Sequence, residues 1–414
     1  MRIFIWHGYL LGGTGSNIYA RQLAREWSRG GHDVTVVSQE AAPGAFDLGG
    51  AATVRPDVGG LLPVFVVDRY EGYEVKRVQD CSRAELDAWV GANAAALRDL
   101  GSADLLFVNH VLLGGAVGAA TGGPYVVKAH GSELEYSMRG NEALSAWGGE
   151  VLAGAVATIV GSGHIRDVVR DVCGTVDGVH EIPPGVDVDL WRPAPKDEAL
   201  ERLVAEARRD PRNRGNGAER LPDEGNAGRL AAFLAGDGHT VVYYGKLMEN
   251  KGVQVLLEAL RGLDARAVIV GFGDYRAELE QRADGLDVLF TGPLDHRHLV
   301  HLLALADAAV VPSIFPEAFG MVAAEAAAAG CPPIVADHSG LAEIARGLEE
   351  AYPPGRGGLA SFPSGDAAAL RERLQAVLAL DGDDRDALRA AARRAAIERW
   401  SWSSVAERIA AVVD

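Results

Sequence analysis

"AAVVPSIFPEAFGMVAAEAAAAGCPPIVAD", residues 308–337, predicts a strand, a loop, a helix and a second strand in succession. The apolar run "AAVVPS" is typical of a buried strand and "IFPEAFG" of a loop. The following "MVAAEAAAA" is alanine-rich, is closed by Gly330 and is stopped by Pro332 and Pro333, as a helix would be. Strand–helix alternation of this kind predicts a parallel sheet with right-handed crossovers.

The same alternation continues through most of the chain. The apolar runs are continuous rather than alternating, which is typical of strands buried on both faces. Besides "AAVVPS" and "PPIVAD" of the opening stretch, the apolar runs are "RIFIW", "DVTVVS", "DLLFVN", "PYVVKA", "ATIVGS", "TVVYYG", "RAVIVG" and "DVLFTG". We therefore predict an α/β protein with two doubly wound, Rossmann-like parallel-sheet domains.

The alternation breaks once, after "EIPPGVDVDLWRPAP". We place the domain boundary between Pro184 and Pro193, with an N-terminal domain over 1–185, a C-terminal domain over 186–384 and terminal helices over 385–414. The polar stretch 207–228, rich in Gly, Pro and charge, predicts a mobile surface segment rather than packed structure.

Composition excludes several classes of protein. The chain of 414 residues has a net charge of −17, whereas nucleic-acid binders normally carry a basic footprint. Cys81, Cys173 and Cys331 are odd in number and widely spaced, which fits reduced thiols in a cytoplasm rather than a disulfide frame or a zinc site. The N-terminus lacks the features of a signal peptide, and no apolar run is long enough to cross a bilayer. No basic amphipathic helix stands out, so we expect a cytoplasmic protein with at most peripheral membrane contact.

Ligands of doubly wound sheets bind outside the carboxyl ends of the strands, where the opening stretch carries two glutamates. The first turn of the alanine-rich helix leaves amides without partners, so a phosphate could dock at residues 319–322. Glu325 lies about 5 Å further along the helix axis, where its carboxylate could accept from a ribose diol. Glu317, before the helix, could hold sugar hydroxyls. The alternative is a loop acid that complements the helix dipole and a solvated helix acid.

Two lysines and a glycine-rich loop are further candidates. Lys246 and Lys251 in "YYGKLMENKG" follow a buried strand and precede a helix, so both could face a departing diphosphate; alternatively they are surface lysines. Gly12 and Gly13 in "LLGGTGSN" would let backbone approach a phosphate, but the loop matches neither common phosphate-binding fingerprint.

His130, in "VVKAHGSE", ends a predicted strand and could donate to a sugar hydroxyl or stabilise charge; a structural histidine is the alternative.

Other motifs are set aside. Asp187 and Asp189 resemble a metal-binding aspartate pair but lie in the interdomain link. "VGSGHI" lacks the nucleophile elbow, so we assign no such role to Ser162. In "DHRHLVH" we expect Asp295 to cap a helix whose exposed face carries the histidines, rather than a metal site formed by His296, His298 and His301.

Several motifs occur together in one order: "LLGGTGSNIYARQLARE", "AHGSELE", "IPPGVDVDLWRP", "YYGKLMENKG" and "FPEAFGMVAAEAAAAGCPPIVADHSGLAEI", whose two glutamates form an E-x7-E pattern. With these motifs the chain resembles, nearly end to end, the family-4 retaining glycosyltransferases of the GT-B architecture. The tail "WSWSSVAERIAAVV" is similar to the terminal helix that crosses back to the first domain in that fold. The resemblance implies two domains that face a cleft, with the acceptor on the N-terminal side and the nucleotide-sugar donor on the C-terminal side.

The resemblance also implies roles for the matching residues. Lys246 and Lys251 would bind the donor diphosphate, and Lys246 replaces a position that is commonly arginine. Glu325 would bind the ribose and His130 would contact the sugar near the reacting carbon. The remaining donor-binding residues implied are Glu317, Phe319, Gly320 and Met321 for the sugar, Val322 for the distal phosphate, and Gly12 and Gly13 opposite the phosphates.

The implied reaction is retaining transfer of a hexose-type sugar, with UDP-sugar as the first expectation, to an acceptor hydroxyl. It would need neither a metal nor a cofactor, because the lysines and the helix end would stabilise the departing diphosphate. A sugar-nucleotide epimerase on the same fold and a catalytically silent sugar-nucleotide-binding partner subunit are the alternatives. The acceptor would be a small molecule, a glycan or a lipid-linked molecule, placed near "GGLLPVFVVDRYEGYEVKRV" and "HGSELEYSM". Tyr70, Tyr73 and Trp89 could stack on a sugar, but core or surface packing is the favoured interpretation for these aromatic residues.

One departure from the family pattern concerns "HSG", residues 338–340, which stands where the family often has a pair of glycines.

Overall fold

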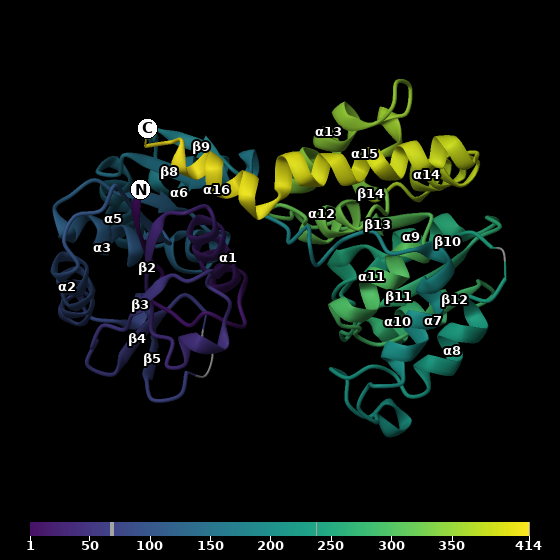
Figure 1. The fold of residues 1–414 in the computed structure, drawn as a ribbon, viewed down its shortest axis with the longest axis horizontal. Helices are drawn as coiled ribbons and strands as arrows, with labels where there is room; N and C mark the ends of the chain where they lie inside the picture. The colour runs from purple at the N-terminus through teal and green to yellow at the C-terminus, as the bar shows by residue number, and fades with distance from the viewer. Residues whose placement is uncertain (67–69, 237, 414) are drawn as a thin grey trace. The chain divides into compact units, whose positions relative to one another are not determined.

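The computed structural model describes residues 1–66, 70–236 and 238–413 (Figure 1). The chain forms two compact units, Met1–Gly185 with Trp402–Asp414, and Val186–Ser401. Within the described ranges, no helix combines the length and the apolar content that a bilayer crossing requires.

The first unit is built on a seven-stranded sheet of order β3-β2-β1-β6-β7-β8-β9, with every neighbouring pair parallel. Its strands are β1 Arg2–Trp6, β2 Asp33–Val37, β3 Ala52–Val54, β6 Leu105–Asn109, β7 Val126–Lys128, β8 Ala157–Val160 and β9 Val179–Glu181; β4 Leu61–Val64 and β5 Glu74–Arg77 form a separate pair. The helices are α1 Gly15–Arg29, α2 Arg83–Asp99, α3 Gly114–Thr121, α4 Gly131–Glu133, α5 Glu142–Ala153, α6 Gly163–Cys173 and α16 Trp402–Ala410.

The second unit is built on a six-stranded parallel sheet of order β12-β11-β10-β13-β14-β15. Its strands are β10 Thr240–Tyr244, β11 Arg266–Val270, β12 Val288–Phe290, β13 Ala308–Val311, β14 Pro333–Ala336 and β15 Ser361–Phe362. The helices are α7 Lys196–Ala207, α8 Asn226–Phe233, α9 Val253–Leu260, α10 Arg276–Arg282, α11 His296–Leu305, α12 Met321–Ala328, α13 Ser339–Ala351, α14 Ala367–Leu378 and α15 Gly382–Trp400.

The predicted α/β class with two doubly wound parallel sheets is confirmed. Each of the ten apolar runs read from the sequence contains a strand, and the central strands β1, β6, β10 and β13 are buried along most of their length because helices cover both faces of the sheet. Helices pack on these faces as amphipathic layers; in the second unit, α12 and α13 lie against α15 (Figure 1).

The terminal helices divide between the two units. The second unit keeps α15, which packs on α12 and α13, so the segment that returns to the first unit begins at Trp402 rather than at residue 385. There α16 packs along α1, and the indole Nε1 of Trp27 donates to the Ala406 carbonyl at 3.0 Å. The aromatic ring of Trp402 fills the space beside Gly185, where a Cβ would lie only 2.4 Å from it.

The polar segment 207–228 lies largely at the surface, as expected, but the expectation that it is not packed is wrong. Asn213 is buried, and its side-chain amide donates to three backbone carbonyls, those of Ala218, Leu221 and Pro222, at 3.0–3.3 Å. Asp223 is also buried and accepts two hydrogen bonds from the Arg276 guanidinium at 2.8 and 2.6 Å. Buried polar groups are stable when they are fully hydrogen-bonded, so a polar composition did not preclude packing here.

Candidate functional site

The strand order of the second sheet reverses between β10 and β13, which are parallel neighbours. Crevices at such a reversal, outside the carboxyl ends of the strands, are where open α/β sheets bind ligands. The turn after β10 carries Lys246 and Lys251, and the loop after β13 carries Glu317 and leads into α12. The structure therefore brings these predicted donor-side residues to one edge of one sheet.

The turn and the loop are packed directly on each other. The carbonyl of Asn250 accepts from the Ile314 amide at 3.0 Å and from the Ser313 hydroxyl at 3.3 Å. Gly252, with φ +72°, fits against the Pro312 carbonyl oxygen so closely that a Cβ would lie 1.8 Å from it. This contact fixes where the preceding Lys251 stands.

Lys251 and Glu317 form an ion pair, with 2.5 Å between Nζ and Oε1. Their side chains are 29% and 24% exposed, so the pair is partly buried yet open to a ligand. Lys246 is exposed, and its carbonyl accepts from the Tyr243 hydroxyl at 2.7 Å. Burial, and in addition the Glu317 carboxylate, raises the pKa of Tyr243, which places that phenol near the same group.

Helix α12 begins with amides that it cannot pair internally. Its first helical hydrogen bonds run from the Ala323 and Ala324 amides to the Gly320 carbonyl, at 2.9 and 3.3 Å. Met321 and Val322 lie in the first turn of α12, and the N–H groups of a first turn have no hydrogen-bond partner within their own helix. Gly320 adopts φ +112°, and the side chain of Leu341 lies 2.5 Å from where its Cβ would be.

Glu325 lies three residues beyond Val322 on the same helix and faces a cavity of about 420 Å³. The cavity is lined by Tyr244, Leu294, Asp295, His296, Arg297, Leu299 and Glu325. Burial raises the pKa of Glu325 to about 8, and a hydrogen bond with Tyr244 works against that shift. At neutral pH the ligand-free protein therefore holds this carboxyl mainly in its protonated form.

Tyr244 is a site residue that the sequence analysis missed. Its hydroxyl donates to the Val322 carbonyl at 2.7 Å, and burial and then the Glu325 charge raise its pKa. It thus joins the end of β10 to the first turn of α12. The available signal was its position, because a hydroxyl at the carboxyl end of a buried strand faces the ligand edge of the sheet.

The glycines of the first unit lie in the loop between β1 and α1, where the order of the first sheet also reverses, between β1 and β6. Gly13 is exposed and adopts φ +94°, with open space around its Cβ position. The side-chain amide of Asn17 donates to the Gly12 carbonyl, and Asn17 Oδ1 lies 2.8 Å from Nε2 of His7. Asn17 and His7 therefore fix the loop, while the backbone of Gly13 stays accessible.

His130 follows β7 and is partly buried. Its Nε2 lies 2.9 Å from Oδ1 of Asn109, and its backbone amide donates to Oε1 of Glu133 at 2.6 Å. Burial, with the neighbouring His110 and Lys128, lowers the pKa of His130 well below its usual value. A neutral imidazole can hydrogen-bond a sugar but cannot supply a positive charge.

The histidines of α11 do not share an exposed face, contrary to the expectation. His298 is fully buried, 3.1 Å from the Asp210 carboxylate, whereas His296 is exposed beside the Trp191 ring. Asp295 stands at the helix start but its side chain accepts no capping hydrogen bond. In the described part of the chain, no three His, Cys, Asp or Glu side chains are grouped so that they could hold a metal ion.

The other residues weighed in the sequence have structural surroundings. Asp187 Oδ1 accepts from the Asp189 and Leu190 amides at 3.2 and 3.0 Å, and Ser162 caps α6. Trp89 is buried against Trp6, so it belongs to the core of the first unit. Residues 67–69 of the predicted acceptor region lie outside the described residues.

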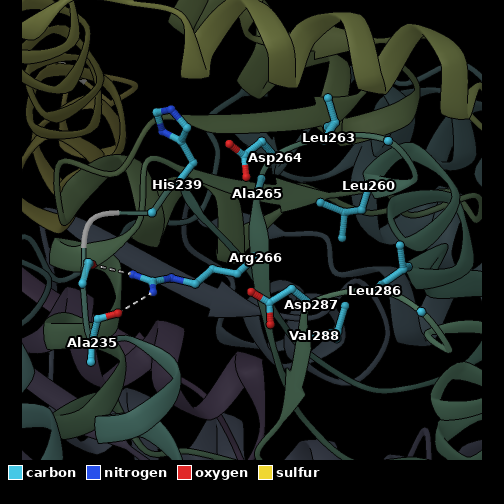
Figure 2. A pocket seen from close by; sticks show the side chains of 14 residues that line it. Ala235, His239, Leu260, Leu263, Asp264, Ala265, Arg266, Leu286, Asp287 and Val288 are labelled. Atoms are coloured by element: carbon cyan, nitrogen blue, oxygen red, sulfur yellow. Dashed lines mark hydrogen bonds between the residues drawn. The ribbon is translucent and has the colours of Figure 1, made fainter.

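A second cavity, of about 290 Å³, lies at the opposite edge of the second sheet, among residues that precede or begin β10, β11 and β12. Figure 2 shows the Arg266 side chain crossing it toward the Ala235 carbonyl, to which it donates at 3.1 Å. Because ligands of such sheets bind at the carboxyl edge, this cavity does not compete with the site at α12.

Comparison with known proteins gives two family models that match in tandem. The model described as "Glycosyltransferase Family 4" matches residues 13–190, and "Glycosyl transferases group 1" matches residues 231–395. The second match includes the turn of Lys251, the loop of Glu317 and all of α12.

Individual relatives agree with these models. The phosphatidyl-myo-inositol mannosyltransferase of Mycobacterium leprae (strain TN) is 34% identical over 48% of this chain and 54% of its own, so the chain spans about half the length of that curated relative. The D-inositol 3-phosphate glycosyltransferase of Corynebacterium jeikeium (strain K411) is 29% identical over 95% of this chain and 90% of its own.

Among solved structures, the sucrose-phosphate synthase from Thermosynechococcus elongatus aligns with a TM-score of 0.61 at 21% identity, over 99% of this chain and 97% of its own. At that identity the likeness concerns the fold alone. The two doubly wound sheets and this likeness give the GT-B architecture, and the two tandem family matches show that the chain belongs to the family-4 glycosyltransferases.

Proposed function

We propose that this protein transfers a hexose-type sugar from a nucleotide-diphosphate sugar to an acceptor hydroxyl, with retention and without a metal. The observation that carries the proposal is the edge of the second sheet at α12. There a cation and a carboxylate, Lys251 and Glu317, lie before helix amides that the helix itself does not pair, and Glu325, three residues beyond Val322 in the same helix, faces a cavity.

The donor fits this edge in three parts. The diphosphate would lie at the amides of Met321 and Val322, where the helix dipole favours an anion, with Lys251 and Lys246 beside it. The ribose diol would donate to Glu325. The sugar would lie toward Glu317, whose carboxylate Lys251 already holds in place.

Catalysis would then be electrostatic. As the bond between sugar and diphosphate breaks, charge grows on the departing phosphate, and the fixed lysines and helix amides stabilise it without reorganising. In a front-face route, the leaving phosphate would accept the proton of the acceptor hydroxyl, so no protein base is required. His130 and the Gly12–Gly13 loop of the first unit would provide further contacts to the sugar and the phosphates.

UDP-hexoses are the first donors to test, and mannose is a candidate sugar besides glucose because one relative is named a mannosyltransferase. The acceptors in the relatives' names, a phosphatidyl-myo-inositol and an inositol phosphate, make polyols with an anionic group the first acceptors to test.

The proposal is tested with a thermal-shift panel of UDP-, GDP-, ADP- and TDP-sugars without metal. We expect one nucleotide to stabilise the protein; at 100 times its Kd the gain is about 2.7 kcal/mol. The shift should be lost in Glu325→Ala, because the ribose loses its carboxylate acceptor. No shift with any nucleotide would contradict the donor site. A shift without consumption of the donor would favour the silent, sugar-nucleotide-binding partner subunit. A shift with donor consumption but no acceptor product would favour the epimerase.

Donor affinity should rise with pH. In the ligand-free protein the pKa of Glu325 is about 8, and a ribose diol binds the ionised carboxylate better than the acid. Binding therefore releases a proton below pH 8, so the Kd should fall by up to about tenfold per pH unit between pH 6.5 and 8 and then level off. Calorimetric titrations measure this, with Glu325→Gln as the control whose Kd should not follow that dependence. An equally steep dependence in Glu325→Gln would assign the proton to another group.

A further inference from the structure

His338 precedes α13, which begins with Ser339 and Gly340, and these three residues lie against the loop that carries Glu317. Ser339 adopts φ +49°, the left-handed region that glycine enters freely and that other residues enter only at a cost. Gly340 cannot carry a side chain, because its Cβ would lie 2.6 Å from the Ala318 and Phe319 backbone. A glycine at position 339 would adopt the same backbone conformation with less strain. The serine hydroxyl is therefore expected to make an interaction that offsets this cost.

That hydroxyl belongs to a chain of hydrogen bonds. Nε2 of His338 lies 2.7 Å from the Ser313 carbonyl, which can only accept, so Nε2 carries the proton. Nδ1 of the same ring lies 3.2 Å from the Ser339 hydroxyl, within hydrogen-bond distance. The Ser339 oxygen in turn accepts from the Glu317 amide at 2.9 Å. The chain ends on the backbone of Glu317.

Glu317 is held from the other side as well, because its carbonyl accepts from the Gly340 amide at 2.9 Å. Ile314, Phe315 and Ala318 of the surrounding loop are exposed, so hydrogen bonds contribute to its conformation. Asn250 holds the loop at Ser313 and Ile314, and residues 338–340 hold it at Glu317 itself.

We infer that Ser339, oriented by His338, is a positioning residue that sets the Glu317 carboxylate against the sugar of the donor. This assignment rests on the proposed function. It predicts a specific pattern, because Glu317 is assigned to the sugar while the nucleoside and diphosphate are assigned to Glu325, Lys251 and the α12 amides. Loss of the Ser339 hydroxyl should weaken binding of the intact nucleotide sugar and spare binding of the free nucleoside diphosphate.

The test compares wild type with Ser339→Gly and Ser339→Ala, using UDP, GDP and their glucose and mannose esters in calorimetric titrations. Both variants should bind the nucleotide sugar about five- to tenfold more weakly, as expected for one lost hydrogen bond, and bind the nucleoside diphosphate within twofold of wild type. Melting temperatures separate the variants: Ser339→Gly should melt at or above wild type because the strain is removed, and Ser339→Ala below it.

Asn216 offers a matched control in the same unit. It also adopts a left-handed conformation, with φ +55°, and its Oδ1 also accepts a backbone hydrogen bond, from Glu224 at 2.7 Å. Asn216→Gly should change the melting temperature without changing the ratio of the two affinities.

Three results would overturn the assignment. Wild-type affinity for the nucleotide sugar in Ser339→Gly would overturn the positioning role alone, and so would an equal loss for both ligands, which indicates a general structural effect. If the wild-type protein bound no nucleotide at all, the proposed function would fall and this assignment with it.

Discussion

Lys251→Ala is expected to slow sugar transfer by about 10²–10³-fold, the effect of removing one fixed donor from a site of developing charge. A cation about 4 Å from the departing phosphate contributes on the order of 4 kcal/mol at an effective dielectric of 20. The fold should survive, because the Lys251–Glu317 pair is partly exposed and such pairs stabilise a protein by only about 0–1 kcal/mol. Release of the nucleoside diphosphate from the donor measures the rate, with the acceptor or with water.

Lys196 provides the control. It is an exposed lysine at the start of α7, in the same unit but away from the α12 edge in sequence and topology. Lys196→Ala should leave the rate unchanged. A Lys251→Ala protein that turned over at the wild-type rate would mean that the diphosphate lies elsewhere.

Gly252→Ala is expected to destabilise the second unit by about 4 kcal/mol or more. Losses of this size are rare, and here a steric clash in the interior would combine with backbone strain. The new Cβ would lie 1.8 Å from the Pro312 carbonyl oxygen and 2.7 Å from its carbon, and φ at this position is +72°. Both of these Pro312 atoms belong to the backbone and cannot move aside as a flexible side chain could. Relief of the clash therefore requires the β10 turn and the β13 loop to separate. Donor binding should be lost together with stability. Thermal and urea unfolding measure the effect.

Gly262 provides a control that separates the cost of the left-handed backbone from the cost of the steric clash. It adopts φ +80°, similar to Gly252, but has no atom within 4 Å of its Cβ position. Gly262→Ala should therefore cost only the left-handed conformation, about 1–2 kcal/mol. Equal losses in the two variants would show that the packing of Gly252 on Pro312 contributes nothing.

Much of this fold could be predicted from the sequence, because strands buried on both faces leave continuous apolar runs. The strands that were missed, such as β3 and β9, have three residues each and are largely exposed, so they leave no such run. The polar segment 207–228 was misjudged for a different reason. Its packing depends on individual hydrogen bonds that composition does not reveal: Asn213 donates to carbonyls within the same segment, and Asp223 accepts from Arg276, which is distant in the chain.

The candidate site divides in the same way. Topology alone places Lys251, Glu317 and Glu325 at the carboxyl edge of one sheet, so their grouping was predictable. Three contacts of the site could not be predicted, because each depends on side-chain directions that packing sets. They are the ion pair between Lys251 and Glu317, the hydrogen bond from Tyr244 to α12, and the hydrogen bond between Ser339 and the Glu317 amide. The raised pKa of Glu325 likewise follows from its burial, which no motif indicates.

The most direct test of the account is amide hydrogen exchange in the full-length protein, with and without a saturating nucleoside diphosphate. The account predicts slowed exchange at Met321 and Val322, whose amides the helix leaves unpaired, and at the cavity segment 294–297 beside Glu325. Protection confined to other segments, with exchange at the start of α12 unchanged by a bound nucleotide, would contradict the placement of the donor at this edge of the second sheet.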